Sequence, residues 1–111
     1  MFGKSKQGAV DVISGSDALN AETIDIARKI IDSCTLKGRP SLVFDLQHVP
    51  LIDSAGLELL LETREACLGR GGLMQIAGLN PLCRDILRVT GHDNSFEIFD
   101  GVVSAVGSFA R

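Results

Sequence analysis

One short motif in this chain could carry chemistry: Asp53-Ser54-Ala55-Gly56, which separates two apolar segments. The pattern predicts that Ser54 lies at the N-terminus of a helix, shortly after a buried strand. Free backbone N–H groups and the helix dipole favour negative charge at such a terminus. A phosphate group on the Ser54 hydroxyl would be well accommodated there. Ser54 is therefore our candidate phosphoacceptor.

Two other roles for Ser54 compete with phosphorylation. It could serve only as the helix N-cap, although the chain has no capping box, because Leu57 stands where Glu or Gln is needed. It could be a nucleophile, but a nucleophilic serine needs a base, and the only histidines, His48 and His92, fall in predicted loops. A Gly-x-Ser-x-Gly elbow is excluded because position 52 is Ile. We therefore expect that the protein is not an enzyme.

The residues around Ser54 have structural and functional interpretations. Asp53 could cap the helix in place of Ser54, or it could be an acidic residue that a kinase reads. Gly56 lies in the first helical turn, where Gly costs about 1 kcal/mol relative to Ala. Such a cost indicates either close packing of the helix or room for a partner. Asp45, near the end of the preceding strand, is expected to bond to the backbone of the following loop.

Other possible sites are excluded by spacing. The glycines at 69, 71 and 72 follow a helix and precede no Lys-Ser/Thr pair, so they end a helix and do not form a phosphate loop. The cysteines form no Cys-x-x-Cys pair and have no histidine at ligand spacing, so we expect neither a metal site nor another cofactor. We expect them to be buried, reduced thiols. They are Cys34, Cys67 and Cys83.

The elements that must position this motif follow from the hydrophobic periodicity. Strands are expected over residues 9–13, 42–46, 73–77 and 96–99, and residues 1–8 are expected to form a short edge strand or to stay loose. Helices are expected between these strands and after the last one. This alternation predicts an α/β fold: one domain over residues 1–111, with a mainly parallel or mixed sheet of four to five strands and about four helices.

The sequence also predicts a cap and a buried face for most of the helices. Asn20, Asn80 and Asp100 are expected to cap the first, third and fourth helices. The second helix is expected to bury a stripe made of Leu57, Leu60, Leu61 and Leu68. The third is expected to bury Leu82, Ile86 and Val89, and the fourth Val102, Val106 and Phe109.

Composition limits the function classes. The chain has 111 residues, 45% of them hydrophobic, with no Trp or Tyr, so the core must be largely aliphatic. Its net charge of −3 argues against nucleic acid as the main ligand. We recognise no signal peptide, and no apolar run approaches the ~20 residues of a membrane span. We therefore expect a cytoplasmic protein that does not insert into membranes.

Several segments resemble a known family. They are Asp45-Leu46, Ile52-Asp53-Ser54-Ala55-Gly56-Leu57, Leu73-Met74-Gln75-Ile76-Ala77-Gly78-Leu79, Ile86-Leu87-Arg88-Val89-Thr90-Gly91 and Phe96-Glu97-Ile98-Phe99. In combination they resemble the STAS domain and, within it, the bacterial anti-sigma factor antagonists. The resemblance covers roughly residues 9 to 107. Asp17 is similar to an acidic residue that the family carries before its first helix, although its spacing from Gly15 departs from the family pattern.

The resemblance implies a partner switch. The unphosphorylated protein would bind an anti-sigma factor that is itself a serine kinase and so release a sigma factor. The kinase would then phosphorylate Ser54, and a phosphatase would reset the cycle. Asp17, Asp53, Ser54, Ala55 and Gly56 are the implied partner-binding residues. The family also allows an alternative: a scaffold of a stress-sensing assembly or a regulatory subunit of a lipid transporter.

Overall fold

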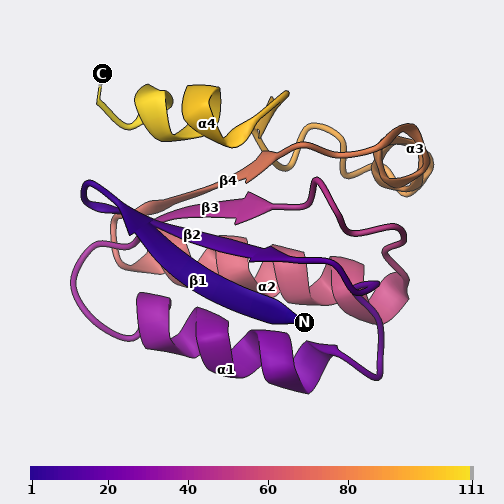
Figure 1. The fold of residues 1–111 in the computed structure, drawn as a ribbon, viewed down its shortest axis with the longest axis horizontal. Helices are drawn as coiled ribbons and strands as arrows, with labels where there is room; N and C mark the ends of the chain where they lie inside the picture. The colour runs from indigo at the N-terminus through magenta and orange to yellow at the C-terminus, as the bar shows by residue number, and fades with distance from the viewer. Residues whose placement is uncertain (111) are drawn as a thin grey trace.

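The chain folds into one five-stranded sheet covered by helices on both faces (Figure 1). The computed structural model describes residues 1–110. In chain order the elements are β1 (Phe2–Gln7), β2 (Val10–Gly15), α1 (Ile24–Thr35), β3 (Ser41–Asp45), α2 (Ser54–Gly69), β4 (Leu73–Ala77), α3 (Pro81–Val89), β5 (Ile98–Phe99) and α4 (Val102–Ser108). The strands lie in the order β1-β2-β3-β4-β5. β1 runs antiparallel to β2, and the others are parallel to their neighbours. The predicted α/β fold with a mixed sheet is confirmed.

The N-terminal segment, for which the sequence left two possibilities, forms the edge strand β1. Gln7 pairs with Val10 across a tight turn, and Gly8 in that turn has a φ of +64°. Glycine adopts this left-handed conformation without the steric cost that a β-carbon brings. The hairpin therefore forms locally and gives β2 its antiparallel neighbour.

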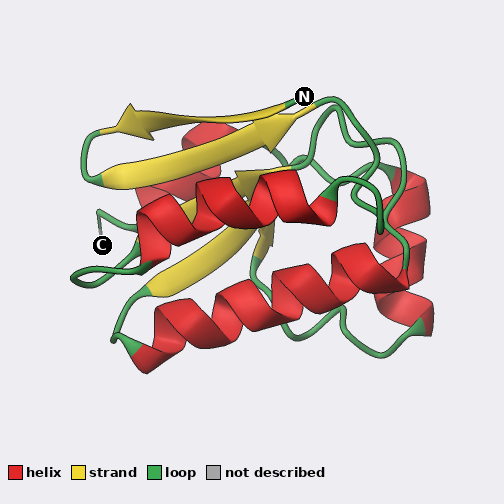
Figure 2. Cartoon of the chain, turned by 90° about the horizontal axis from the view of Figure 1, so that it is seen from below, coloured by secondary structure: helices red, strands yellow, loops and turns green. Residues whose placement is uncertain are grey.

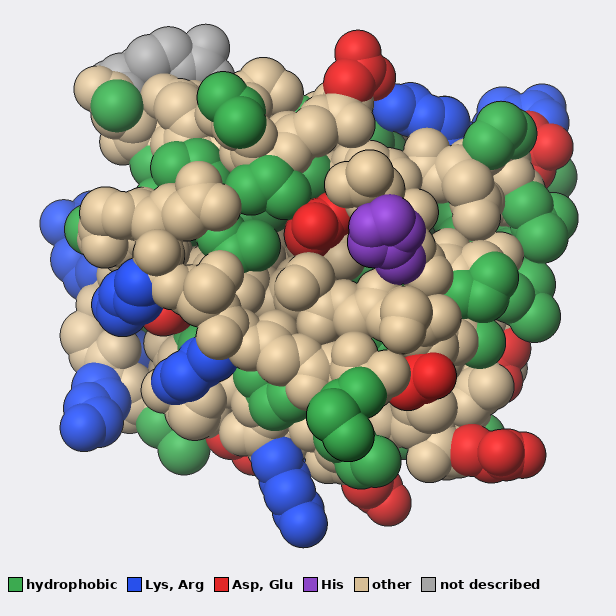
Figure 3. Space-filling view, viewed as in Figure 1, with side chains coloured by type: hydrophobic (Ala, Val, Ile, Leu, Met, Phe, Trp, Pro, Cys, Tyr) green, Lys and Arg blue, Asp and Glu red, His purple; other side chains and the backbone are tan. Residues whose placement is uncertain are grey.

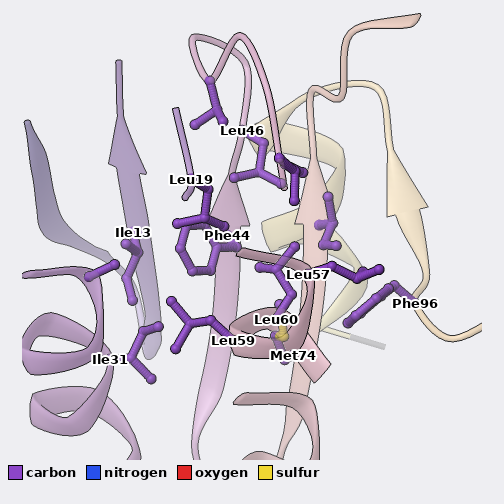
Figure 4. Close-up of a cluster of buried hydrophobic side chains, with 14 of the residues drawn as sticks. Ile13, Leu19, Ile31, Phe44, Leu46, Leu57, Leu59, Leu60, Met74 and Phe96 are labelled. Carbon is purple, nitrogen blue, oxygen red and sulfur yellow. The ribbon is translucent and has the colours of Figure 1, made fainter. Parts of the chain in front are cut away.

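Side chains of the central strand β3 alternate between two apolar layers. Leu42 and Phe44 belong to the larger core cluster, which α1 and α2 cover (Figures 2 and 4). Val43 belongs to a smaller cluster, which includes Ala105 of α4 on the opposite face (Figure 1). Successive residues of a strand point to opposite faces, so a continuous apolar run is what a strand covered on both faces needs.

The carboxyl ends of the parallel strands meet at one edge of the sheet, and α1 and α2 begin there (right side of Figure 1). At this edge Leu19 forms an isolated parallel bridge with Ile52. Both side chains are fully buried. The loop before α1 is thus joined to the loop before α2, and the predicted site lies at this junction.

Three predicted termini were wrong, two of them in helices and one in a strand. α1 has Thr23 as its N-cap, because Asn20 instead accepts hydrogen bonds from the backbone N–H groups of Glu22 and Thr23 within a preceding turn. α4 has Gly101 as its N-cap, not Asp100. β5 contains only two residues, because Phe96 is buried in the larger core cluster and does not pair as a strand. The predicted cap at Asn80 is confirmed, since its side chain accepts from the N–H of Cys83 at 2.7 Å.

Two predicted buried faces need correction. On α2, Leu57 and Leu60 are buried as expected, whereas Leu68 is 41% exposed. The buried stripe also contains Leu59, Thr63 and Cys67.

On α3, the buried residues are Cys83 and Leu87, and Leu82 and Val89 are exposed. The Asn80 amide donates to the carbonyls of Val49 and Pro50, and this anchor sets how α3 is turned toward the core. On α4, the predicted face of Val102, Val106 and Phe109 does pack against the smaller cluster.

Candidate functional site

Ser54 is the first residue of α2, and its side chain is exposed. The loop that precedes it leaves the carboxyl end of β3, at the edge where α1 also begins (Figure 1). Within residues 1–110, the Ser54 hydroxyl has no hydrogen-bond partner in the protein. An exposed hydroxyl at a helix N-terminus is open to a modifying enzyme, and the backbone around it favours negative charge.

Asp53, and not Ser54, is the N-cap of α2. Asp53 has an extended backbone (φ −94°, ψ −173°), and its carboxylate accepts a hydrogen bond from the N–H of Gly56. The Oδ1–N distance is 2.9 Å. This is the geometry of an N-cap three residues ahead of its donor. Of the two interpretations for Asp53, capping is therefore confirmed, and the capping-only role of Ser54 is excluded.

The same carboxylate also joins the two loops of the site. Asp53 Oδ2 accepts from the N–H of Ala21, at 3.4 Å. Two backbone hydrogen bonds run alongside: the Leu19 N–H donates to the Leu51 carbonyl at 2.9 Å, and the Asp53 N–H donates to the Leu19 carbonyl at 3.1 Å. The motif is therefore held by a hydrogen-bonded backbone, although the Ser54 side chain is exposed.

Gly56 is required by the approach of this neighbouring loop. A β-carbon at position 56 would overlap the carbonyl group of Leu19, and Gly56 is buried. Of the two explanations for a glycine here, close packing is the one that the structure favours. The first turn of α2 and the loop before α1 are in direct backbone contact.

The other candidate residues have partners outside the motif. The Asp17 carboxylate forms an ion pair with the Met1 amino group, and its side chain is 52% exposed. No hydrogen bond or ion pair within residues 1–110 joins Asp17 to the Asp53–Gly56 motif. Asp45 accepts from the N–H of Gln47 at 3.0 Å, which confirms the predicted bond to the following loop.

The histidines do not form a catalytic pair with Ser54 in the described part of the chain. His48 is exposed in the loop after β3, and no hydrogen bond joins it to Ser54. The ring of His92 instead lies 3.3 Å from the Ser95 hydroxyl. The arrangement that a serine nucleophile requires is thus not seen here.

The three cysteines are free and buried, as predicted. Burial raises the pKa of the Cys67 thiol to about 11, with a smaller contribution from Cys34. It also raises the pKa values of Cys34 and Cys83. Among the described residues, no group of three His, Cys, Asp or Glu side chains is placed to hold a metal ion. In the same part of the chain, the helices are too short or too polar to cross a membrane.

Two residues of the site were not found from the sequence. Leu19 and Ala21 hold the motif through backbone groups, and Ala21 lies 32 positions before Asp53. Backbone contacts leave no signature in residue type. The glycine at position 56 indicated close packing as one of two explanations, but it does not show which segment approaches it.

A family model described as "STAS domain" matches residues 5–105. No curated protein matches the chain in sequence. Among solved structures, a candidate anti-sigma factor antagonist from Thermotoga maritima has a TM-score of 0.92 at 22% identity, covering 99% of this chain and 95% of the other.

Two further proteins show how widely this fold is used. The anti-sigma factor antagonist SpoIIAA matches in its unphosphorylated form with a TM-score of 0.83, at 15% identity, covering 99% of this chain and 96% of the other. The phosphorylated form of SpoIIAA from Bacillus matches with a TM-score of 0.76 at 15% identity, over 98% and 99% of the chains. A sulfate transporter family protein from Wolinella succinogenes has a TM-score of 0.76 at 18% identity, over 95% and 88%. At these identities the similarity concerns the fold.

Proposed function

The chain belongs to the STAS family, and from this premise we propose that it is an anti-sigma factor antagonist controlled by phosphorylation of Ser54. In its unphosphorylated form it binds an anti-sigma factor that is a serine kinase, and the sigma factor is released. The chain acts as ligand and substrate in this cycle, and the kinase supplies the catalysis.

The observation that carries this proposal is that Asp53 caps α2, whereas the Ser54 hydroxyl takes no part in the cap. Asp53 supplies the helix cap, so the Ser54 hydroxyl is not needed to hold α2. A phosphate on Ser54 would therefore leave the capping hydrogen bond intact. It would also sit at the positive end of a helix of 16 residues. These features suit a residue that is modified and restored repeatedly without unfolding.

In the proposed cycle, the Ser54 oxygen attacks the γ-phosphorus of ATP held by the kinase. The bond from that phosphorus to the β,γ-bridging oxygen breaks, ADP leaves and the hydroxyl proton is released. The phosphorylated surface then carries about −1.5 to −2 additional charges at pH 7, and the complex dissociates. A phosphatase hydrolyses the phosphoester with water and restores the hydroxyl.

We assign the partner-binding surface to the motif and its surroundings. Ser54 and Ala55 offer side chains at the start of α2, and Asp53 contributes a negative charge beside them. Gly56 is buried, so its part is to set the shape of the first turn. Asp17 is included as well, because its side chain is 52% exposed and it precedes Leu19, whose backbone is bonded to Asp53.

A second candidate is a STAS domain that acts as a scaffold of a stress-sensing assembly or regulates a lipid transporter. The fold similarity to the Wolinella sulfate transporter family protein supports a transporter-linked role as the alternative to be tested. Under this function Ser54 would still be exposed, but the tightest partner would not be an ATP-dependent kinase.

The deciding experiment uses Ser54→Ala as bait in the native cytoplasm, because this variant cannot be phosphorylated and should retain its kinase. Ser104→Ala is the matched control, since Ser104 is an exposed serine on α4. Recovery of an ATP-binding serine kinase, held more tightly by Ser54→Ala than by Ser104→Ala, would support the antagonist function. Recovery of transporter or scaffold subunits without a kinase would favour the second candidate.

A further inference from the structure

A basic groove lies at the opposite end of the strands from Ser54, near the amino ends of β2 and β3. Basic side chains line it from the edge strand β1 and from the loop between α1 and β3: Lys4, Lys6, Lys37 and Arg39. Its volume is about 240 Å³. The groove also contains Asp11, near the amino end of β2. Arg39 of the groove contacts Gly71, just beyond the C-terminus of α2, whereas Ser54 is at the start of this helix, which spans about 24 Å over its 16 residues.

The charge of this groove is opposite to that of the chain as a whole. The protein has a net charge of −3, yet the groove gathers four basic side chains around one carboxylate. Figure 3 shows Lys and Arg side chains gathered on the left of the view, over the β1–β2 hairpin and the C-terminal end of α1. Such a concentration of one sign attracts oppositely charged partners and accelerates their association.

Most of these cations lack an acidic partner within residues 1–110. Of the four, Lys6 alone pairs with a carboxylate of the described residues, that of Asp11 at 3.5 Å. Lys4 donates to the Ser33 hydroxyl at 3.0 Å, and Arg39 donates to the Gly71 carbonyl at 3.2 Å. These neutral acceptors orient the side chains but leave their positive charge uncompensated. The groove is thus arranged to receive carboxylates from another molecule.

The edge of the sheet beside this groove is also open. β1 pairs with β2 on one side only, as the first strand in the sheet order. Apart from Phe2, its residues are exposed. Lys4 and Lys6 are two positions apart, so both side chains lie on the same face of β1. An extended segment added to this edge would place alternate side chains next to the two lysines.

From these observations we propose that the basic groove docks an acidic, extended segment of a protein partner, which adds to the sheet along β1. Lysine on an edge strand disfavours pairing with a second copy, because identical strands would bring like charges together. The same lysines favour a strand with Glu or Asp at alternate positions. A long nucleic acid fits less well, since Asp11 lies within the groove and the rest of the protein is acidic.

The proposal is tested by titrating the full chain with a fluorescein-labelled peptide of alternating Glu and Thr, against a peptide of alternating Gln and Thr. Lys37→Glu reverses a groove charge, and Lys29→Glu makes the same change on an exposed lysine of α1 outside the groove. We expect Lys37→Glu to weaken Glu-Thr binding about fivefold or more and Lys29→Glu to change it less than about twofold. Ser54→Asp should bind this peptide like the wild type, which separates the groove from the proposed function.

Hydrogen exchange of the peptide complex tests strand addition, because the amides of Phe2–Gln7 that point away from β2 should become protected. Equal binding by Lys37→Glu and Lys29→Glu would overturn the groove assignment, and binding without added protection in β1 would overturn the strand addition. Two further titrations, with a single-stranded oligonucleotide and with phosphatidylserine vesicles, test other polyanions. The proposal would also be overturned if either bound more tightly than the Glu-Thr peptide and if Lys37→Glu abolished that binding.

Discussion

The backbone carbonyl of Leu19 occupies the space into which a side chain at position 56 would extend from α2. Gly56 therefore allows the loop before α1 to lie directly against the first turn of α2. This contact is between main-chain atoms, so the rotation of a side chain cannot relieve it. The position of Ser54 depends on this packing, because Ser54 and Gly56 share the same helical turn.

Gly56→Ala is expected to destabilise the protein, although Ala is the better helix former by about 1 kcal/mol. The overlap with Leu19 should outweigh that gain and leave a net loss of about 1–3 kcal/mol. Gly69→Ala is the matched control, because a β-carbon at Gly69, the last residue of α2, meets no atom within 4 Å. Urea denaturation of both variants measures the difference. Equal stability of the two variants would contradict the close-packing explanation.

Asp53→Ala should cost about 0.5–2 kcal/mol of stability, since it removes the N-cap of α2. Asp53→Asn keeps an oxygen that can accept from the Gly56 N–H, but its amide nitrogen cannot accept from the Ala21 N–H, so it should lose less stability than Asp53→Ala. The comparison isolates the capping hydrogen bond from the second hydrogen bond and the charge. Thermal or urea unfolding provides the readout, and a loss in Asp53→Asn as large as that in Asp53→Ala would show that the cap is not the main contribution of Asp53.

The order of the elements could be predicted from the sequence because it depends on local patterns. A continuous apolar run predicted β3, and the pair Asn80-Pro81 predicted the start of α3. The motif at Ser54 was placed correctly at a helix start for the same reason. The choice between Asp53 and Ser54 as cap was not decided, because both residue types are suitable and their positions differ by one.

Apart from the caps of α1 and α4, the features that were missed depend on tertiary contacts. α3 has apolar residues on more than one side, so periodicity alone favoured Leu82 and Val89, whereas the anchor from Asn80 to the Val49 carbonyl buries Leu87. The contact of Gly56 with Leu19 joins the first turn of α2 to a loop far earlier in the sequence. No local pattern encodes such a pairing.

The corrected face of α3 leads to a direct comparison of two substitutions. Leu87 is fully buried, whereas Val89 is 74% exposed. Leu87→Ala should therefore lower the free energy of unfolding by about 2–5 kcal/mol, and Val89→Ala should change it by less than about 0.5 kcal/mol. Urea titrations suffice for this test. The reverse ranking would mean that α3 packs through the predicted face of Leu82, Ile86 and Val89.

Cys67 should make stability fall at alkaline pH. Its pKa is raised to about 11 in the folded protein, mainly by burial, against about 8.5 for an unfolded thiol. A raised pKa contributes stability below the unfolded value, and this contribution is lost as pH rises through the folded value. Stability should therefore decline between about pH 8.5 and 11, and less steeply in Cys67→Ala. Parallel slopes for the two proteins would contradict this account.

The incorporation of phosphate provides the direct test of the modification site. Incubation with the partner kinase and ATP should add one phosphate to the wild type and to Ser104→Ala, and none to Ser54→Ala. Mass spectrometry of the three intact proteins and their peptides gives the answer. Unchanged modification of Ser54→Ala would move the phosphoacceptor to another residue.

Ser54→Asp separates the effect of negative charge on folding from its effect on binding. Ser54 is exposed at the positive end of α2, where a negative charge gains about 0.3–1 kcal/mol, and the nearby Asp53 carboxylate opposes part of that gain. Stability should therefore change by less than about 1 kcal/mol.

At the interface, a charge placed where the partner receives a neutral hydroxyl can cost several kcal/mol, and 1.4 kcal/mol is already a tenfold loss of affinity. We expect the variant to melt like the wild type and to bind the kinase at least about tenfold more weakly. Calorimetry and thermal melts on the same samples measure both quantities, with phosphorylated wild type as the comparison, because Asp carries less charge than phosphate. If both the variant and the phosphorylated protein fold normally and bind like the wild type, charge at Ser54 is not the switch.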